Sequence, residues 1–136
     1  MPAGSRMPNN PPVDRRQVGA AAEDAAHAFL TGNGLKLSAR NVRYPFGEID
    51  LILLDAATVV FVEVRFRRTS NFGGAAVSVD ASKRRKIARA AQAWLSSHRQ
   101  FSQAPCRFDV VAVTPASTGG VQCEWIRSAF TLDDLW

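Results

Sequence analysis

Two carboxylates and a guanidinium stand close together in the most apolar part of this 136-residue chain. Asp50 lies in one apolar run and Glu63 in the next, and Arg65 follows two residues after Glu63. Paired carboxylates suit hard cations such as Mg²⁺, Mn²⁺ or Ca²⁺ better than zinc, and a neighbouring cation stabilises charge that develops on a phosphoryl group. The spacing therefore favours metal-assisted phosphodiester hydrolysis, with Mg²⁺ or Mn²⁺ held by Asp50, Glu63 and the backbone carbonyl of Val64.

The two apolar runs, residues 49–54 and 58–66, predict the strands of a β-hairpin that turns at residues 55–57. Both runs are apolar at successive positions, so both faces of these strands should be covered. A charge inside such strands costs several kcal/mol unless a partner compensates it. The acids and the arginine of this hairpin therefore need partners, and a metal site would supply them.

The register of the hairpin decides whether the two carboxylates meet. A two- or four-residue turn centred on residues 56–57 places Asp50 opposite Glu63, and Glu48 opposite Arg65. Opposed Cβ atoms lie about 5 Å apart, so facing carboxylates need a shared proton or a cation between them. A three-residue turn would shift the register by one and put the carboxylates on opposite faces, so the predicted metal site depends on the turn.

An alanine-rich segment, residues 15–31, predicts a helix that stops at the Gly-Asn-Gly sequence of residues 32–34. Glu23 falls at the edge of its apolar stripe, whereas Asp24 and His27 point further outward. Glu23 is a candidate third catalytic carboxylate that reaches into the site from the helix. A solvated glutamate beside the stripe explains the same position equally well, because surface helices often carry such residues.

A second helix should begin at Asp80 or Ser82, either of which can cap it, and extend to about residue 98. Cations oppose the helix dipole at an N-terminus, so the basic residues of its first turns favour the binding of an anion. Lys83 lies on the side that faces the sheet and is a candidate to reach the two carboxylates. A solvated basic helix start is the alternative interpretation.

Positive charge is concentrated between Arg65 and Arg89, a segment with eight of the seventeen basic residues and a single acid. The formal net charge of the chain is +5. A phosphate backbone is the natural partner of such a patch, and Arg84 and Arg85 should face outward from the second helix to meet it. The candidate nucleic-acid-binding residues are Arg67, Arg68, Arg84, Arg85 and Lys86.

The rest of the chain completes a sheet. Further strands are predicted at residues 35–42, 107–114 and 121–126. Asp109 is most simply a local ion-pair partner, and residues 67–76 predict a glycine-rich loop. The expected fold is one α/β domain over residues 15–136, with a mixed central sheet flanked by helices, after a disordered tail at residues 1–14.

Composition excludes several classes of protein. Cys106 and Cys123 have no CxxC spacing and no nearby histidine, so a zinc or redox motif is not expected and the thiols should be free. No apolar stretch approaches the length of about 18 residues that spans a membrane, and the N-terminal segment has no apolar signal core. A cytoplasmic protein without a membrane partner is therefore expected.

At Asp50 and at Glu63-Val64-Arg65 the chain resembles the core motif of the PD-(D/E)xK nuclease superfamily, which includes proteins like Holliday-junction resolvases. The segments GEIDLI, FVEVRFR, FGGAAVSVD with SKRRKI, and CRFDVVAV with EWIRSAF are similar to the YraN-like family of poorly characterised bacterial proteins. The resemblance covers roughly residues 20–130. It implies a restriction-endonuclease-like αβββαβ core, a nucleic-acid substrate and a nuclease-like site.

Position 65 departs from the superfamily motif, which has lysine where this chain has arginine. Arginine stays charged and can orient a phosphate or stabilise a transition state, but it cannot act as a general base. Activation of water would then fall to the metal. Lys83 is a candidate to supply the missing lysine to the site.

The favoured function is that of a Mg²⁺-dependent nuclease acting on DNA, including branched or damaged DNA. A non-catalytic nucleic-acid-binding protein that retains the nuclease fold is the alternative. A third interpretation is a regulatory protein whose basic face binds an acidic protein. Junction-cutting nucleases of this fold often act as dimers, so a homodimer is compatible with the sequence, although no residue requires it.

Overall fold

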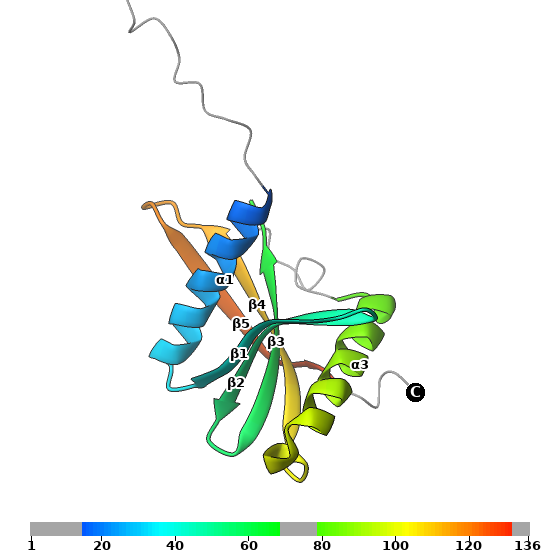
Figure 1. The fold of residues 1–136 in the computed structure, drawn as a ribbon. Coiled ribbons are helices and arrows are strands. Elements are labelled where there is room, and N and C mark those ends of the chain that lie inside the picture. Colours follow the sequence, from blue (N-terminus) through cyan, green and yellow to red (C-terminus); the bar gives the residue numbers. More distant parts are fainter. Residues whose placement is uncertain (1–14, 69–78, 132–136) are drawn as a thin grey trace, which may run out of the picture.

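The computed structural model describes residues 15–68 and 79–131, which form a five-stranded sheet between two long helices (Figure 1). In chain order the elements are α1 (Arg15–Gly32), β1 (Lys36–Tyr44), β2 (Gly47–Asp55), β3 (Thr58–Phe66), α3 (Ala81–Ser97), the 3-10 helix η2 (Arg99–Phe101), β4 (Cys106–Pro115) and β5 (Val121–Phe130). The predicted order of helices and strands is confirmed. The predicted tail at residues 1–14 and most of the predicted loop at residues 67–76 lie outside the described residues.

The strands lie side by side in the order β1-β2-β3-β4-β5. Neighbouring strands are antiparallel, except that β3 and β4 are parallel and are connected through α3. Helix α1 covers one face of the sheet and α3 covers the other (Figure 1). The expected mixed α/β fold with a nuclease-like αβββαβ core is therefore confirmed.

Each face of the sheet has its own apolar core, which explains why the central strands are apolar at successive positions. In β3, Phe61 packs toward Trp94 of α3, whereas Val60 and Val62 lie on the α1 side. The buried residues that α1 contributes are Ala22, Ala26 and Leu30. Within the described ranges, no helix is both long and apolar enough to cross a membrane.

The hairpin of β2 and β3 has a two-residue turn, closed by Asp55 opposite Thr58. The ladder continues as far as Leu51 opposite Val62, one position before the two carboxylates. This is the register that a short turn was expected to impose, so the predicted register is confirmed over these residues. The turn therefore directs Asp50 and Glu63 toward the same place.

Beyond this point β2 leaves β3 and continues with β1 as an arm that leans on α3 (Figure 1). Gly47, at the start of β2, lies so close to α3 that a Cβ atom there would overlap the carbonyl oxygen of Lys86. Glu48 faces Arg43 across the β1–β2 ladder, and their side chains approach to 3.5 Å. The predicted pairing of Glu48 with Arg65 is therefore wrong, because the two strands separate before reaching it.

Two strands, β1 and β5, continue at least two residues past their predicted C-terminal ends. β1 extends to Tyr44 because it stays paired with β2 as far as Gly47. β5 extends to Phe130, which lies opposite Phe108 beyond an irregularity in the β4–β5 ladder. Ser128, within this irregular stretch, has a left-handed φ of 51°. A bulge of this kind lets a strand resume its pairing after the local pattern has been interrupted.

Candidate active site

The two carboxylates of the hairpin meet where β2 and β3 separate. The backbone N–H of Val64 donates to Oδ2 of Asp50 at 2.8 Å, so the aspartate occupies the place where a ladder partner would otherwise lie. Glu63 is buried, with 5% of its surface exposed, and its side chain hydrogen-bonds with that of Asp50. The contact that the sequence predicted between these residues is present in the fold.

Burial is the main reason why the pKa of Asp50 is raised, to about 8. The negative charge of Glu63 and the hydrogen bond to it raise this pKa further, and the charge of Glu23 adds a smaller contribution. The hydrogen bond from the N–H of Val64 acts in the opposite direction. Asp50 therefore holds its proton at neutral pH.

Lys83 reaches this pair from α3, with Nζ 2.8 Å from Oε2 of Glu63. Asp80 caps the helix by accepting a hydrogen bond from the backbone N–H of Lys83 at 2.9 Å, which fixes where the first turn begins. Partial burial lowers the pKa of Lys83, but the hydrogen bond and charge of Glu63 outweigh it, so the pKa is raised overall. The lysine is therefore a positioned cation at neutral pH rather than a base.

Glu23 of α1 lies at the rim of the same site. Its side chain is 17% exposed, and Nη2 of Arg40 lies 3.9 Å from Oε1. Burial raises the pKa of Glu23, although a hydrogen bond from Asn41 and the charge of Arg40 lower it. Glu23 is therefore more buried than a solvated glutamate beside an apolar stripe would be. Its negative charge also contributes to the raised pKa of Asp50.

The donor set fits a magnesium-like ion bound mainly through water. Among residues 15–68 and 79–131, no three aspartate, glutamate, histidine or cysteine side chains converge closely enough to hold a metal together. Glu23 therefore stands beside the pair of Asp50 and Glu63 rather than completing a cage with them. Mg²⁺ typically keeps several waters and binds through one or two carboxylates, so the number of carboxylates in this pair is compatible with such an ion.

Arg65 is half-buried on β3 and shares a strand face with Glu63 two residues before it. Its charge lowers the pKa of Lys83, which places the two cations in the same electrostatic environment. The predicted arginine and lysine are therefore brought together around one carboxylate pair.

The predicted nucleic-acid-binding residues differ in their solvent exposure. Arg68, Arg85 and Lys86 are exposed and Arg67 is half-buried. Arg84 does not face outward as predicted, because its Nε donates to the carbonyl of Val79 at 2.6 Å and its guanidinium lies 5.6 Å from the ring centre of Phe130. Nothing near Arg84 in the sequence signals this contact, since Phe130 comes from the far end of the chain.

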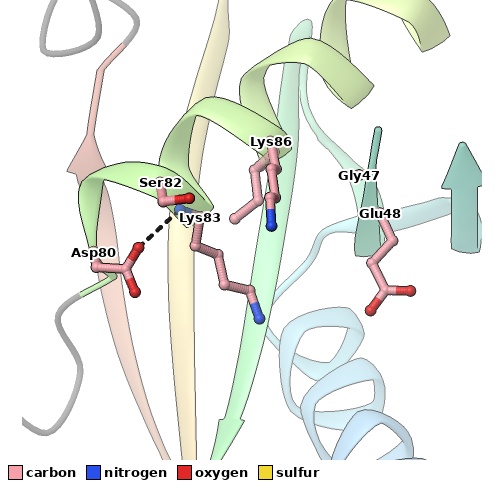
Figure 2. Close-up of a pocket in the computed structure, with 7 residues that line it drawn as sticks. Gly47, Glu48, Asp80, Ser82, Lys83 and Lys86 are labelled. Atoms are coloured by element: carbon pink, nitrogen blue, oxygen red, sulfur yellow. Dashed lines mark hydrogen bonds between the residues drawn. The ribbon is translucent and has the colours of Figure 1, made fainter. Parts of the chain in front are cut away.

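A cavity of about 370 Å³ lies between the start of α3 and the start of β2 (Figure 2). Figure 2 shows Lys83 and Lys86 on the side of the helix that adjoins Gly47 and Glu48. A second cavity, of about 520 Å³, is lined by α1 and β1 and includes Glu23 and Asn41. Asp50 and Glu63 line neither cavity, but Lys83, which contacts Glu63, lines the first, and Glu23 lines the second.

The sequence did not predict the partners of Glu23. Asn41 hydrogen-bonds with it from an irregular point of β1, where asparagine adopts a φ of 52°. Asparagine tolerates this left-handed conformation better than most residues. A polar residue in an edge strand carries no local pattern that would have indicated this contact.

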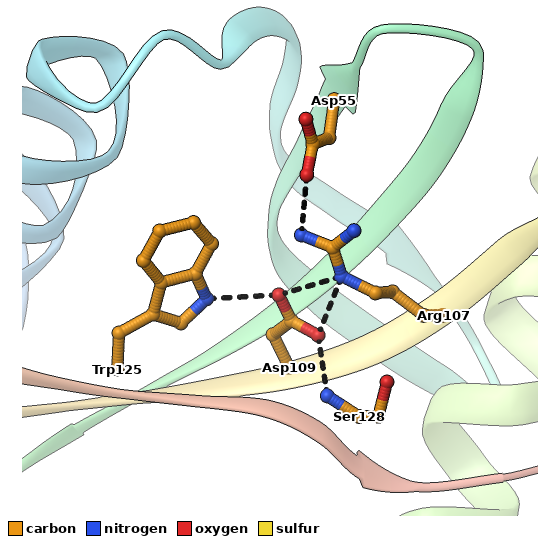
Figure 3. A network of polar contacts seen from close by, with 5 residues as sticks. All are labelled: Asp55, Arg107, Asp109, Trp125 and Ser128. Atoms are coloured by element: carbon orange, nitrogen blue, oxygen red, sulfur yellow. Dashed lines mark hydrogen bonds and ion pairs between the residues drawn. The ribbon is translucent and has the colours of Figure 1, made fainter.

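A second polar network, away from the carboxylate pair, ties the sheet together (Figure 3). Asp109 is fully buried, with 0% of its surface exposed, and accepts from Arg107 Nε, the Trp125 indole N–H and the Ser128 backbone N–H. Arg107 also pairs with Asp55 at 2.9 Å. The predicted local ion pair of Asp109 is confirmed. The groups that donate to Asp109 come from β4 and β5, so the network joins these two strands and is structural.

These features define a small mixed α/β protein whose nuclease-like core carries paired carboxylates and a lysine at the separation of two central strands. The chain belongs to the family described as "Uncharacterised protein family UPF0102", whose model matches residues 22–113. This is the YraN-like bacterial family predicted from the sequence, so that assignment is confirmed.

Two relatives illustrate how far the similarity extends. A UPF0102 protein of Xanthomonas campestris pv. campestris (strain B100) is 51% identical over 123 residues, which cover 90% of this chain and 98% of the relative. A UPF0102 protein of Xylella fastidiosa (strain 9a5c) is 49% identical over 122 residues, again covering 90% of this chain and 98% of the relative. The similarity therefore extends over almost the full length of these relatives.

Proposed function

We propose that this protein is a metal-dependent nuclease that hydrolyses phosphodiester bonds in nucleic acid, most simply DNA, in the cytoplasm. One observation carries the proposal: Asp50, Glu63 and Lys83 meet at the separation of β2 and β3, beside a cavity lined with further lysine. A buried glutamate beside a half-buried aspartate with a raised pKa is costly for a fold, and such arrangements are enriched at functional sites.

Each residue of the site has its own role in the proposed reaction. Mg²⁺ or Mn²⁺, when bound by Asp50, Glu63 and the carbonyl of Val64, would polarise the phosphoryl group and acidify a water molecule. Lys83 holds its proton and positions the reacting phosphate by charge. Arg65 stabilises charge on the phosphoryl oxygens and does not act as a base.

The test is a panel of labelled single-stranded, duplex, flap and junction substrates incubated with Mg²⁺ or Mn²⁺. Wild-type protein should cleave at least one of them, and Asp50→Asn or Glu63→Gln should lower the rate by at least about 100-fold, because each replaces a carboxylate that would bind the metal in its deprotonated form. Matched controls are Asp24→Asn and Glu124→Gln, which alter exposed acids on α1 and β5 and should leave the rate unchanged. Equal activity of all four variants would contradict the proposal.

A nucleic-acid-binding protein without catalysis is the second candidate, and the ion pair between Lys83 and Glu63 favours it. A lysine that neutralises a carboxylate weakens the attraction of that carboxylate for a metal ion. Under this alternative every substrate is bound and none is cut, with or without metal. Binding without cleavage across the whole panel would therefore replace the first proposal with the second.

The separate roles of Lys83 and Arg65 are tested with variants of each. If Lys83 supplies the lysine that position 65 lacks, Lys83→Ala and Arg65→Ala should both reduce cleavage strongly. Full activity of Lys83→Ala, with loss of activity in Arg65→Ala, would assign the essential charge to the arginine alone.

A further inference from the structure

The connection between β1 and β2 carries two aromatic rings that the proposed hydrolysis does not use. Tyr44 and Phe46 stack with their ring centroids 5.4 Å apart and their planes 3° apart. Phe46 is 36% exposed, and the guanidinium carbon of Arg89 lies 5.3 Å from the centre of its ring. An exposed aromatic stack beside a cation is a surface on which a nucleobase can stack.

This stack is fixed in position relative to the carboxylates. Gly47 follows Phe46 directly and lies against the backbone of Lys86, so the end of the arm rests on α3. Three residues further along β2 the chain reaches Asp50. A recognition surface needs such rigid support, because a loosely held ring would lose conformational freedom when it binds.

A row of cations connects the stack to the carboxylates. Lys83, Lys86 and Arg89 are spaced three residues apart and form an oblique row on α3, about 9 Å long along the helix axis. Lys83 contacts Glu63 at one end, and Arg89 contacts Phe46 at the other. Lys86 lies between them and lines the cavity shown in Figure 2.

We propose that the Tyr44–Phe46–Arg89 stack holds an unpaired base of the nucleic-acid strand whose phosphate reaches Glu63 and Lys83. The inference rests on the proposed function and names its substrate class: strands with unpaired nucleotides at the cleavage point, such as single strands, flaps and branch points. The backbone follows the row of cations, and the base extends the stack. A continuous duplex offers no free base, because its bases already stack on one another.

The test compares binding of a labelled oligothymidylate with binding of a continuous duplex of the same length, by fluorescence anisotropy in EDTA so that no strand is cut. Wild-type protein should bind the single strand more tightly. Phe46→Leu should weaken single-strand binding by about tenfold, since base stacking on an aromatic ring contributes roughly 1–3 kcal/mol per base. Binding of the duplex should stay unchanged.

The matched control is Phe101→Leu, which removes a ring stacked 5.6 Å from that of Trp94 and remote from the carboxylates. It should alter neither affinity. A second measurement does not depend on any variant: a strand containing 5-iododeoxyuridine, irradiated on wild-type protein, should cross-link to Tyr44 or Phe46. Cross-links confined to other elements would overturn the inference, as would equal binding of both nucleic acids by wild-type protein.

The outcomes separate this inference from the proposed function. Cleavage by wild-type protein with no change of selectivity in Phe46→Leu would overturn the stacking site and keep the nuclease. Selective binding that depends on Phe46, without cleavage on any substrate, would keep the stacking site and overturn the nuclease.

Discussion

The raised pKa of Asp50 links the stability of this protein to pH. The pKa of Asp50 rises from 3.8 to about 8 on folding, chiefly because the group is buried. Between these values the folded chain binds more protons at this position than the unfolded chain, so the free energy of unfolding should fall as pH rises. The destabilisation is complete only above about pH 8.

The first prediction is that Asp50→Asn removes this dependence. Asparagine retains an oxygen for the N–H of Val64 but carries no charge, so the variant should gain stability over wild-type protein, by a few kcal/mol, as pH rises from 4 to 8. Urea unfolding in EDTA at several pH values measures the difference. Asp24→Asn, in an exposed acid, is the control and should follow the wild-type curve. Parallel curves for wild type and Asp50→Asn would refute the raised pKa of Asp50.

A second residue-scale prediction concerns Asp109, the acid at the centre of the network in Figure 3. Asp109→Ala leaves the indole of Trp125 without its acceptor and the guanidinium of Arg107 with Asp55 alone, so it should lower the free energy of unfolding by about 3–5 kcal/mol. Asp55→Ala removes only a partly exposed carboxylate from the same arginine and should cost less than about 1 kcal/mol. Chemical denaturation of both variants measures how much each lowers the free energy of unfolding. Equal losses of stability would contradict the structural role of Asp109.

At the scale of elements, the two-residue turn between β2 and β3 fixes the register on which the site depends. Ala56 in this turn has a φ of 52°, in the left-handed region, whereas Ala57 does not. An L-residue with a Cβ atom pays about 1 kcal/mol or more in that conformation. The turn is therefore strained at one position, although the short connection brings the two carboxylates together.

The third prediction follows from that strain. Ala56→Gly should raise the free energy of unfolding by about 0.5–1 kcal/mol, because glycine adopts positive φ without a steric cost and loses part of the gain to its greater freedom when unfolded. Ala57→Gly is the matched control and should lower stability slightly. Thermal unfolding of the two variants reports the difference, and a loss of stability in both would mean that the turn is not strained.

Elements with a local signal were predictable, and contacts between distant segments were not. The alanine stripe and glycine stop of α1, the cap at Asp80 and the short turn all act over a few residues, so their sequence patterns gave the correct elements and register. The separation of β2 from β3 was missed, because it follows from the packing of Gly47 on α3, thirty-nine positions further along at Lys86. For the same reason the orientation of Arg84 against Phe130 was missed.

At the scale of the whole molecule, the site joins three elements that the sequence keeps apart. Asp50 comes from β2, Glu63 from β3 and Lys83 from α3, and the crossover through α3 is what brings the lysine to the carboxylates. The sequence predicted this meeting because each residue occupied a face that its helix or strand turns inward. It did not predict the aromatic stack at Phe46, since no periodic pattern extends through the connection between two strands.

Positive charge over the whole chain leads to the last prediction, on how nucleic-acid binding responds to salt. With a net charge of +5, and with exposed cations such as Arg85 near the site, binding should release counterions from phosphates. The logarithm of the binding constant should therefore fall linearly with the logarithm of salt concentration.

Arg85→Gln should reduce the slope by about 0.7–0.9, the contribution of one phosphate contact. Arg99→Gln, in an exposed arginine of η2 at the other end of α3, should not change it. Anisotropy titrations at several salt concentrations give the slopes. A slope near zero for wild-type protein would mean that its basic surface meets something other than a phosphate backbone, whereas equal slopes for both variants would move the contact away from the first turns of α3.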